Sequence, residues 1–220
     1  MIQAVFFDLD NTLIDFMKMK QMSCEAAISA MIDAGLIVKK EEAMKALYAL
    51  YDKYGMEDPL IFQRLLKQLT GEINPRIIAN GIVSYRKVRL GFLDSYPHVK
   101  TVLLELKRRN IKTAIVTDAP RLKAWIRLAS MKIDDLFDTV VSYEDTNERK
   151  PSSQPFLVAL QKLNVQPEFC LMVGDWPERD VHGAKKLGIK TCFARYGNPT
   201  VKKSGADYEI SDILDLLSLL

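Results

Sequence analysis

Two aspartates separated by one residue follow a short, mostly apolar run at the start of the chain. The run Ile2 to Phe7 is typical of a strand buried on both faces of a parallel sheet, and Asp8 and Asp10 come directly after it. Side chains alternate along an extended chain, so both carboxyl groups start out toward the same side. Neighbouring carboxylates repel each other unless a positive group lies between or beside them, and a divalent cation shared with a phosphate ester would meet that need. The alternative is a strand-to-turn junction in which Asp and Asn11 only cap a helix.

Other polar residues follow later strand-like runs in the same way. Residues 112–117, 138–142 and 169–173 are short, apolar and β-branched, and each is followed by polar or charged residues at its end or in the next loop. The carboxyl ends of parallel strands lie along one edge of a sheet, where ligands of open α/β folds bind. The residues expected there, beside Asp8 and Asp10, are Thr117, Asp118, Lys150, Asp175 and Asp180.

The elements that would position these residues alternate between strand and helix from Tyr96 onward. Amphipathic helices are expected over 99–109, 120–131, 155–163 and 180–187, further strands over 190–194 and 208–210, and a leucine-rich helix at the C-terminus. This alternation predicts right-handed βαβ units and a doubly wound, Rossmann-like parallel sheet of the α/β class. Residues 1–15 and 91–220 are therefore assigned to one α/β core domain.

The segment between these parts, residues 16–90, has a different pattern. Apolar residues recur at helical spacing in four stretches, and Gly35, Gly55 and Gly71 end the first three. Asn74-Pro75 begins the fourth with a cap residue and a first-turn proline. We expect a helical bundle inserted into the core domain. Basic residues near its two ends are candidates for binding a second anion, although a solvated face is the favoured interpretation: Lys18, Lys20, Arg86, Lys87 and Arg89.

Composition excludes several classes of function. The formal net charge is +3, and the basic clusters 107–109 and 202–203 contain no aromatic residues, so no nucleic-acid partner is expected. The three cysteines are widely spaced, and the two histidines are too few for a histidine-rich metal site. The chain shows no signal peptide and no apolar run long enough to cross a membrane. We therefore expect a soluble, cytoplasmic protein; the sequence does not indicate its oligomeric state.

Four of these motifs, taken in order, resemble those of the haloacid dehalogenase-like hydrolase superfamily. They are D-L-D-N-T from Asp8, V-T-D ending at Asp118, Lys150-Pro151, and G-D-W-P-E-R-D from Gly174 to Asp180. The resemblance covers the whole chain, because the helical insert lies where that family places its C1 cap. It implies a Mg²⁺-dependent phosphatase that acts on a small phosphate ester, such as a triose phosphate, another sugar phosphate or phosphoglycolate.

The resemblance also implies a role for each residue. Asp8 would be the nucleophile that forms an aspartyl-phosphate, and Asp10 the general acid and then the general base. Thr117, Asp118 and Lys150 would bind the phosphoryl group. Mg²⁺ would be held by Asp8, by the backbone carbonyl of Asp10 and by Asp175. Thr12 and Asp180 would support these groups from behind, Asp180 by holding Lys150 or a metal-bound water.

Asp10 distinguishes between branches of that superfamily. Its dehalogenases lack a carboxylate at this position, so Asp10 indicates a phosphatase or a phosphomutase. The alternatives to a phosphatase are therefore a phosphomutase and, from another class, a non-catalytic phosphate-binding module. The chain departs from many relatives at Asp118, where they have asparagine, and at Glu178-Arg179 beside Asp180.

Overall fold

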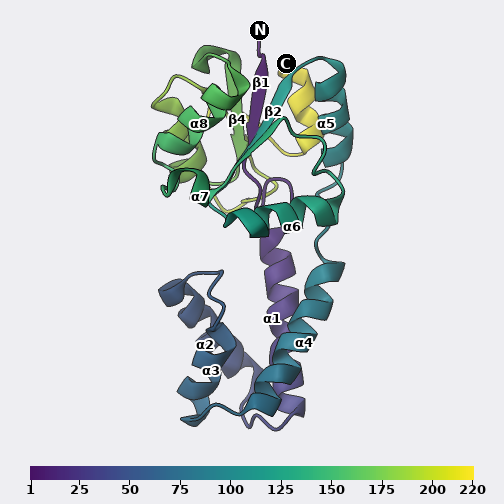
Figure 1. The fold of residues 1–220 in the computed structure, drawn as a ribbon, viewed down its shortest axis with the longest axis vertical. Helices are drawn as coiled ribbons and strands as arrows, with labels where there is room; N and C mark the ends of the chain where they lie inside the picture. Colours follow the sequence, from purple (N-terminus) through teal and green to yellow (C-terminus); the bar gives the residue numbers. More distant parts are fainter. The chain divides into compact units, whose positions relative to one another are not determined.

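The computed structural model describes all 220 residues, which divide into two units that are described here one at a time. The first unit consists of Met1–Phe16 and Leu93–Leu220, and the second of Met17–Phe92. The inserted helical bundle was predicted at residues 16–90, and the second unit spans residues 17–92. The chain passes from one unit to the other at the start of α1 and again after α4 (Figure 1).

Six strands form one sheet at the centre of the first unit. In spatial order they are β3 (Thr139–Val141), β2 (Lys112–Val116), β1 (Ala4–Phe7), β4 (Cys170–Gly174), β5 (Lys190–Ala194) and β6 (Tyr208–Ile210). Every neighbouring pair is parallel, which confirms the predicted doubly wound α/β class. The strand order reverses at β1, where Phe7 lies level with Ile115 of β2 and Val173 of β4. A ligand site is expected at the carboxyl ends of the strands at such a point.

Helices cover both faces of the sheet. One face, which includes Phe6, packs against α8 (Gln154–Leu163), where Phe156 is fully buried. On the other side of the sheet lie α5 (Val99–Arg108) and the 3₁₀ helix η3 (Ile213–Ser218), which is yellow in Figure 1. The remaining elements are α6 (Arg121–Met131), α7 (Tyr143–Thr146), the 3₁₀ turn η1 (Pro167–Phe169), the π turn η2 (Pro177–Val181) and α9 (His182–Lys185).

Two of the predicted helices differ in the structure. The C-terminal segment is a 3₁₀ helix rather than an α-helix; it has only six residues, and Asp212 and Asp215 close a capping box around its first turn. The helix expected at 180–187 begins earlier, as the π turn η2, and its α-helical part is only four residues long. A single π turn is often found at a functional site, and this one carries Asp180.

Four helices form the second unit, as the apolar periodicity predicted. They are α1 (Phe16–Asp33), α2 (Lys40–Tyr54), α3 (Ile61–Thr70) and α4 (Pro75–Gly91). Asn74 caps α4 by accepting from the backbone N–H groups of Arg76 and Ile77, with Pro75 in the first turn. The apolar faces of all four helices share one buried cluster, which contains Ile28, Leu47 and Leu65.

The expectation that Lys20 lies on a solvated face was wrong. Its exposed fraction is 5%, and its ammonium group donates to the carbonyl of Met56 at 2.6 Å and to the hydroxyl of Tyr85 at 3.2 Å. The ammonium group also lies 4.3 Å from the centre of the Tyr51 ring, a cation–π contact. The burial of Lys20 could not be predicted from the sequence, because its partners are distant along the chain.

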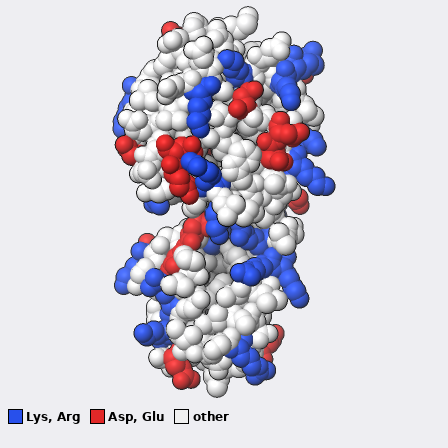
Figure 2. All heavy atoms as spheres, viewed as in Figure 1, with Lys and Arg blue, Asp and Glu red and all other residues white.

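Surface charge and hydropathy carry less information. Basic and acidic side chains are interspersed over the face of each unit that Figure 2 shows. None of the helices combines the length and the apolar composition needed to span a lipid bilayer. The three cysteines are buried free thiols.

Candidate active site

The loop after β1 turns back on itself immediately beyond Asp8. The backbone N–H of Asp8 donates to the carbonyl of Val173, which ties the end of β1 to β4. Asn11 then takes a left-handed conformation with φ of 58° and donates to the carbonyl of Ile14 at 2.7 Å. Asparagine tolerates this conformation better than most residues, which accounts for its place in the turn.

A second loop, after β5, holds this turn in place. Tyr196 donates its hydroxyl to the carbonyl of Thr12 at 2.8 Å, and Asn198 donates to the carbonyl of Asp175 at 3.3 Å. Between them, Gly197 lies so close that a Cβ atom would be 1.8 Å from the carbonyl oxygen of Asn11. The loops after β1, β4 and β5 therefore form one packed layer. This loop was not predicted to belong to the site, because a single glycine in a polar loop gives no specific signal.

Lys150 lies at the centre of the charged groups. Its ammonium group donates to Oδ1 of Asp8 and to Oδ1 of Asp180, both at 2.6 Å, and its side chain is buried. Burial alone would lower the pKa of Lys150, but the negative charges of Asp180 and Asp8 outweigh it and raise the pKa above its usual range. Lys150 therefore stays protonated. The backbone N–H of Lys150 donates to Oδ1 of Asp118 at 2.9 Å, and the peptide bond to Pro151 is cis.

Asp180 fits beneath the end of β4 because Gly174 has no side chain. A Cβ atom at Gly174 would lie 2.3 Å from Oδ2 of Asp180, and that oxygen accepts from the backbone N–H of Trp176 at 3.0 Å. Burial, and to a lesser degree the charge of Asp8, raise the pKa of Asp180 to about 6, although Lys150 opposes the shift. Gly174 is thus required for close packing rather than for a special backbone angle.

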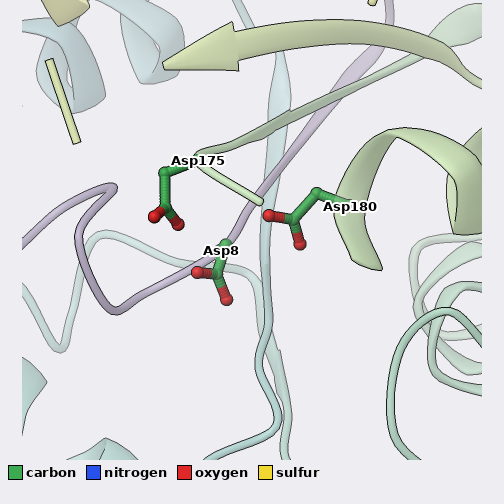
Figure 3. Close-up of side chains that lie close together, drawn as sticks. All are labelled: Asp8, Asp175 and Asp180. Carbon is green, nitrogen blue, oxygen red and sulfur yellow. The ribbon is translucent and has the colours of Figure 1, made fainter. Parts of the chain in front are cut away.

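Three carboxylates converge at this edge of the sheet (Figure 3). Asp8, Asp175 and Asp180 are all buried, and one oxygen of each lies within 4.8 Å of the others. Lys150 bonds to two of them, but no lysine or arginine pairs with Asp175. Burial, followed by the charges of Asp8 and Asp180, accordingly raises the pKa of Asp175 to about 8. The group lacks a second positive charge, and three carboxylates are the oxygen donors that a hard divalent cation prefers, so the cluster fits a metal ion.

The carboxylate of Asp10 pairs with a different positive group, the guanidinium of Arg127. Its side chain lies outside the three-carboxylate cluster, and its Oδ2 accepts from Nη1 of Arg127 at 3.0 Å. Arg127 is on α6 and only 1% exposed. The positive partner beside Asp10 is therefore an arginine that the sequence analysis missed. A signal was present: Arg127 interrupts the buried apolar face of α6 between Ala124 and Leu128.

The loop after β2 brings two more of the predicted residues to this edge. Thr117 is buried, and its hydroxyl oxygen accepts from the N–H of Ala119 at 3.2 Å, which leaves its hydrogen to donate. Asp118, besides accepting from Lys150, lies 3.5 Å from Nη1 of Arg179. The guanidinium group of Arg179 in turn stacks 4.2 Å from the centre of the half-exposed Trp176 ring. Arg179 thus offsets the extra negative charge that Asp118 brings in place of an asparagine.

Thr12, expected to support the site, is fully buried, and its hydroxyl oxygen has no hydrogen-bond partner in the protein. The structure therefore brings Asp8, Lys150, Asp175 and Asp180 into one cluster. Asp10, Thr117 and Asp118 belong to the same sheet edge but have partners of their own. The roles assigned to these residues from the sequence stay predictions.

A family model described as haloacid dehalogenase-like hydrolase matches residues 2–188. A glyceraldehyde 3-phosphate phosphatase from Pyrococcus furiosus is 35% identical, over 100% of this chain and 93% of its own, and one from Methanocaldococcus jannaschii is 32% identical, over 100% and 97%. Among solved structures, an HAD phosphatase from Thermococcus onnurineus superposes with a TM-score of 0.72 at 25% identity, covering 99% of this chain and 97% of its own.

Proposed function

The chain belongs to the haloacid dehalogenase-like hydrolases, and from that premise we propose that it removes the phosphate from a three-carbon sugar phosphate. It is a phosphoric monoester hydrolase acting on a small metabolite. Two relatives that it matches over its full length are named glyceraldehyde 3-phosphate phosphatase, and this ester is therefore the first candidate substrate. We also propose a cytoplasmic location, because three free thiols suit a reducing compartment.

One observation supports the chemistry most directly. Asp8 is buried at the switch point of the sheet with Lys150 fixed on one of its oxygens, while a second carboxyl group, Asp10, is held apart by its own cation. Two carboxyl groups with different environments suit two different roles, one as nucleophile and one in proton transfer. This separation favours covalent phosphoryl transfer over simple phosphate binding.

The cofactor in this proposal is Mg²⁺. Asp8, Asp175 and the backbone carbonyl of Asp10 would hold it, while Asp180 is already occupied by Lys150 and by the N–H of Trp176. When bound, the ion neutralises negative charge on the phosphoryl oxygens and on the carboxylates around them.

The residues of the chain then divide the reaction into two steps. A carboxylate oxygen of Asp8 attacks phosphorus, the bond from phosphorus to the ester oxygen breaks, and Asp10 gives that oxygen a proton. In the second step Asp10 takes a proton from water, the water oxygen bonds to phosphorus, and the acyl bond to Asp8 breaks to release phosphate. Lys150 and the Thr117 hydroxyl stabilise the charge that builds on the phosphoryl oxygens.

The test is phosphate release from a panel of esters. The panel contains glyceraldehyde 3-phosphate, glycerol phosphate, phosphoglycolate, hexose phosphates and pyrophosphate, each with Mg²⁺ and with EDTA. We expect the highest kcat/KM on the triose phosphate, no turnover in EDTA, and loss of activity in Asp8→Asn, which preserves the shape of the side chain but is a very poor nucleophile. Asp134→Asn is a matched control at an exposed aspartate outside the site and should retain activity.

Two outcomes would contradict this proposal. Absence of turnover on every ester, or full activity of Asp8→Asn, would remove the phosphatase assignment. Slow net hydrolysis combined with activation by a sugar bisphosphate would instead indicate a phosphomutase.

A further inference from the structure

Arg127 is the largest fully buried side chain in the protein. It projects from the middle of α6 with an exposed fraction of 1%. A buried guanidinium group is costly unless it is paired and hydrogen-bonded, so a position of this kind needs an explanation. Methionine or leucine would fill the same space on the apolar face of α6 without that cost.

The contacts of Arg127 join three segments of the first unit. Its Nη1 donates to Oδ2 of Asp10 at 3.0 Å, in the loop after β1, and its guanidinium carbon lies 4.6 Å from the centre of the Phe16 ring. Phe16 is itself buried, so the guanidinium group rests against an apolar wall and its direction is fixed. The Asp10 side chain is 26% exposed, unlike that of Arg127, although its Oδ1 atom is buried.

From this geometry we propose that Arg127 is a positioning residue for Asp10 in proton transfer, an inference that rests on the role given to Asp10 above. An aspartate side chain turns about two bonds, and a charge-assisted hydrogen bond to Oδ2 restricts both. The carboxyl group then presents its other oxygen, Oδ1, in one direction. A general acid or base must come within about 2.6–3.2 Å of its partner oxygen, so such restriction translates into rate.

The position of α6 supports this role. The helix starts at Arg121, directly after the phosphate-binding loop with Thr117 and Asp118, and supports Asp10 from its second turn. One rigid element therefore sets both the loop that is expected to bind the phosphoryl group and the carboxyl group that is expected to protonate the leaving oxygen.

Two esters whose leaving groups differ in basicity can distinguish a positioning role of Arg127 from a role in folding. The experiment compares kcat/KM on glycerol phosphate, whose alkoxide must be protonated as it leaves, with kcat/KM on p-nitrophenyl phosphate, whose phenolate leaves without a proton. The variants are Arg127→Met, Arg127→Lys and Asp10→Asn, with circular dichroism and thermal melting of each. Because kcat/KM reports only steps up to the first irreversible one, it isolates the departure of the leaving group from the later hydrolysis.

We expect Arg127→Met to lose about 10²-fold on glycerol phosphate and less than about tenfold on p-nitrophenyl phosphate, because general acid catalysis contributes about 10²–10⁴. Arg127→Lys, which keeps a donor and a charge, should regain part of the loss on glycerol phosphate. Asp10→Asn should show the same selectivity, to a larger extent. The double variant should be no slower than Asp10→Asn alone, since positioning has no effect on a residue that cannot transfer a proton.

Several results would overturn the inference. Equal losses on both esters in Arg127→Met would mean that Arg127 serves folding, and unchanged kinetics would mean that it serves neither. If Arg127→Met does not fold, Arg127→Lys replaces it, and an equal loss on both esters in that variant has the same meaning.

The Asp10→Asn variant shows which proposal has failed. If Asp10→Asn distinguishes the two esters and the Arg127 variants do not, only the inference about Arg127 fails. If Asp10→Asn itself does not distinguish them, the role proposed for Asp10 fails as well, and the inference falls with it.

Discussion

Asp175 should make the metal-free protein less stable as the pH rises through neutrality. In the folded protein the pKa of Asp175 is raised to about 8, whereas in the unfolded chain the carboxyl group returns to its ordinary value near 4. Between these two values the folded state binds a proton that the unfolded state does not. The stability that Asp175 contributes is therefore fully present below pH 4 and is lost as the pH rises toward 8. This direction is the opposite of that for a carboxylate stabilised by a salt bridge.

The size of the effect follows from the same two values. One extra proton in the folded state corresponds to about 1.4 kcal/mol per pH unit. Integrated from pH 6 to pH 8, and allowing for the loss of that proton near pH 8, Asp175 accounts for about 2 kcal/mol. The pKa of Asp180 is raised only to about 6, so its contribution falls mainly below this range.

Tryptophan fluorescence can measure this effect in one unit alone. Both tryptophans, Trp125 and Trp176, belong to the α/β unit, so urea unfolding followed by their emission reports on that unit. In EDTA, wild type should lose about 2 kcal/mol from pH 6 to 8, and Asp175→Asn should lose much less. Saturating Mg²⁺ should restore stability at pH 8 in wild type only. A wild-type stability that is flat or rises over this range in EDTA, or an equal slope in Asp175→Asn, would refute the reasoning.

Three further variants test the packing of the site. Gly174→Ala would place a methyl group against Asp180, and we expect a loss of about 1–3 kcal/mol in urea unfolding together with reduced phosphatase activity. Lys150→Met leaves the buried carboxylates of Asp8 and Asp180 without their cation, so stability at pH 8 should fall by about 3–5 kcal/mol and recover in part at pH 5, where Asp180 is protonated. Gly197→Ala, which collides with a backbone oxygen of the loop after β1, should lower kcat more than Gly91→Ala, whose glycine has open space around it and no positive φ. Unchanged kinetics of Gly197→Ala would show that the loop adjusts.

The fold was largely predictable because it depends on local patterns. Alternating strands and helices fixed the α/β class, and the abrupt change to helical periodicity after Asp15 marked the inserted bundle. Elements shorter than two turns were not predictable in type. The C-terminal segment became 3₁₀ and the segment at Asp180 became a π turn, because capping side chains and tertiary contacts decide the geometry of such short pieces.

The site was predictable as far as residues follow strands. Asp8, Lys150 and Asp175 could be placed together because parallel strands end at one edge. Arg127 was missed because it reaches the site from an amphipathic helix, and Gly197 because a single glycine in a polar loop gives no specific signal. A pairing over more than a hundred residues of sequence leaves a trace only as a charge on an otherwise apolar helix face. Such a charge is worth examining in any amphipathic helix that borders a site.

The measurement that tests the central claim most directly is chemical trapping of the phosphoenzyme. The Asp10→Asn variant is mixed with p-nitrophenyl phosphate, whose phenolate leaves without a proton, and with Mg²⁺, and is then quenched with borohydride. Borohydride reduces an aspartyl-phosphate to homoserine, which mass spectrometry locates in the sequence. We predict homoserine at position 8 and at no other aspartate, and none when Asp8→Asn is added. Turnover by the wild type without any trapped residue, or homoserine at another position, would contradict the assignment of Asp8 as the nucleophile.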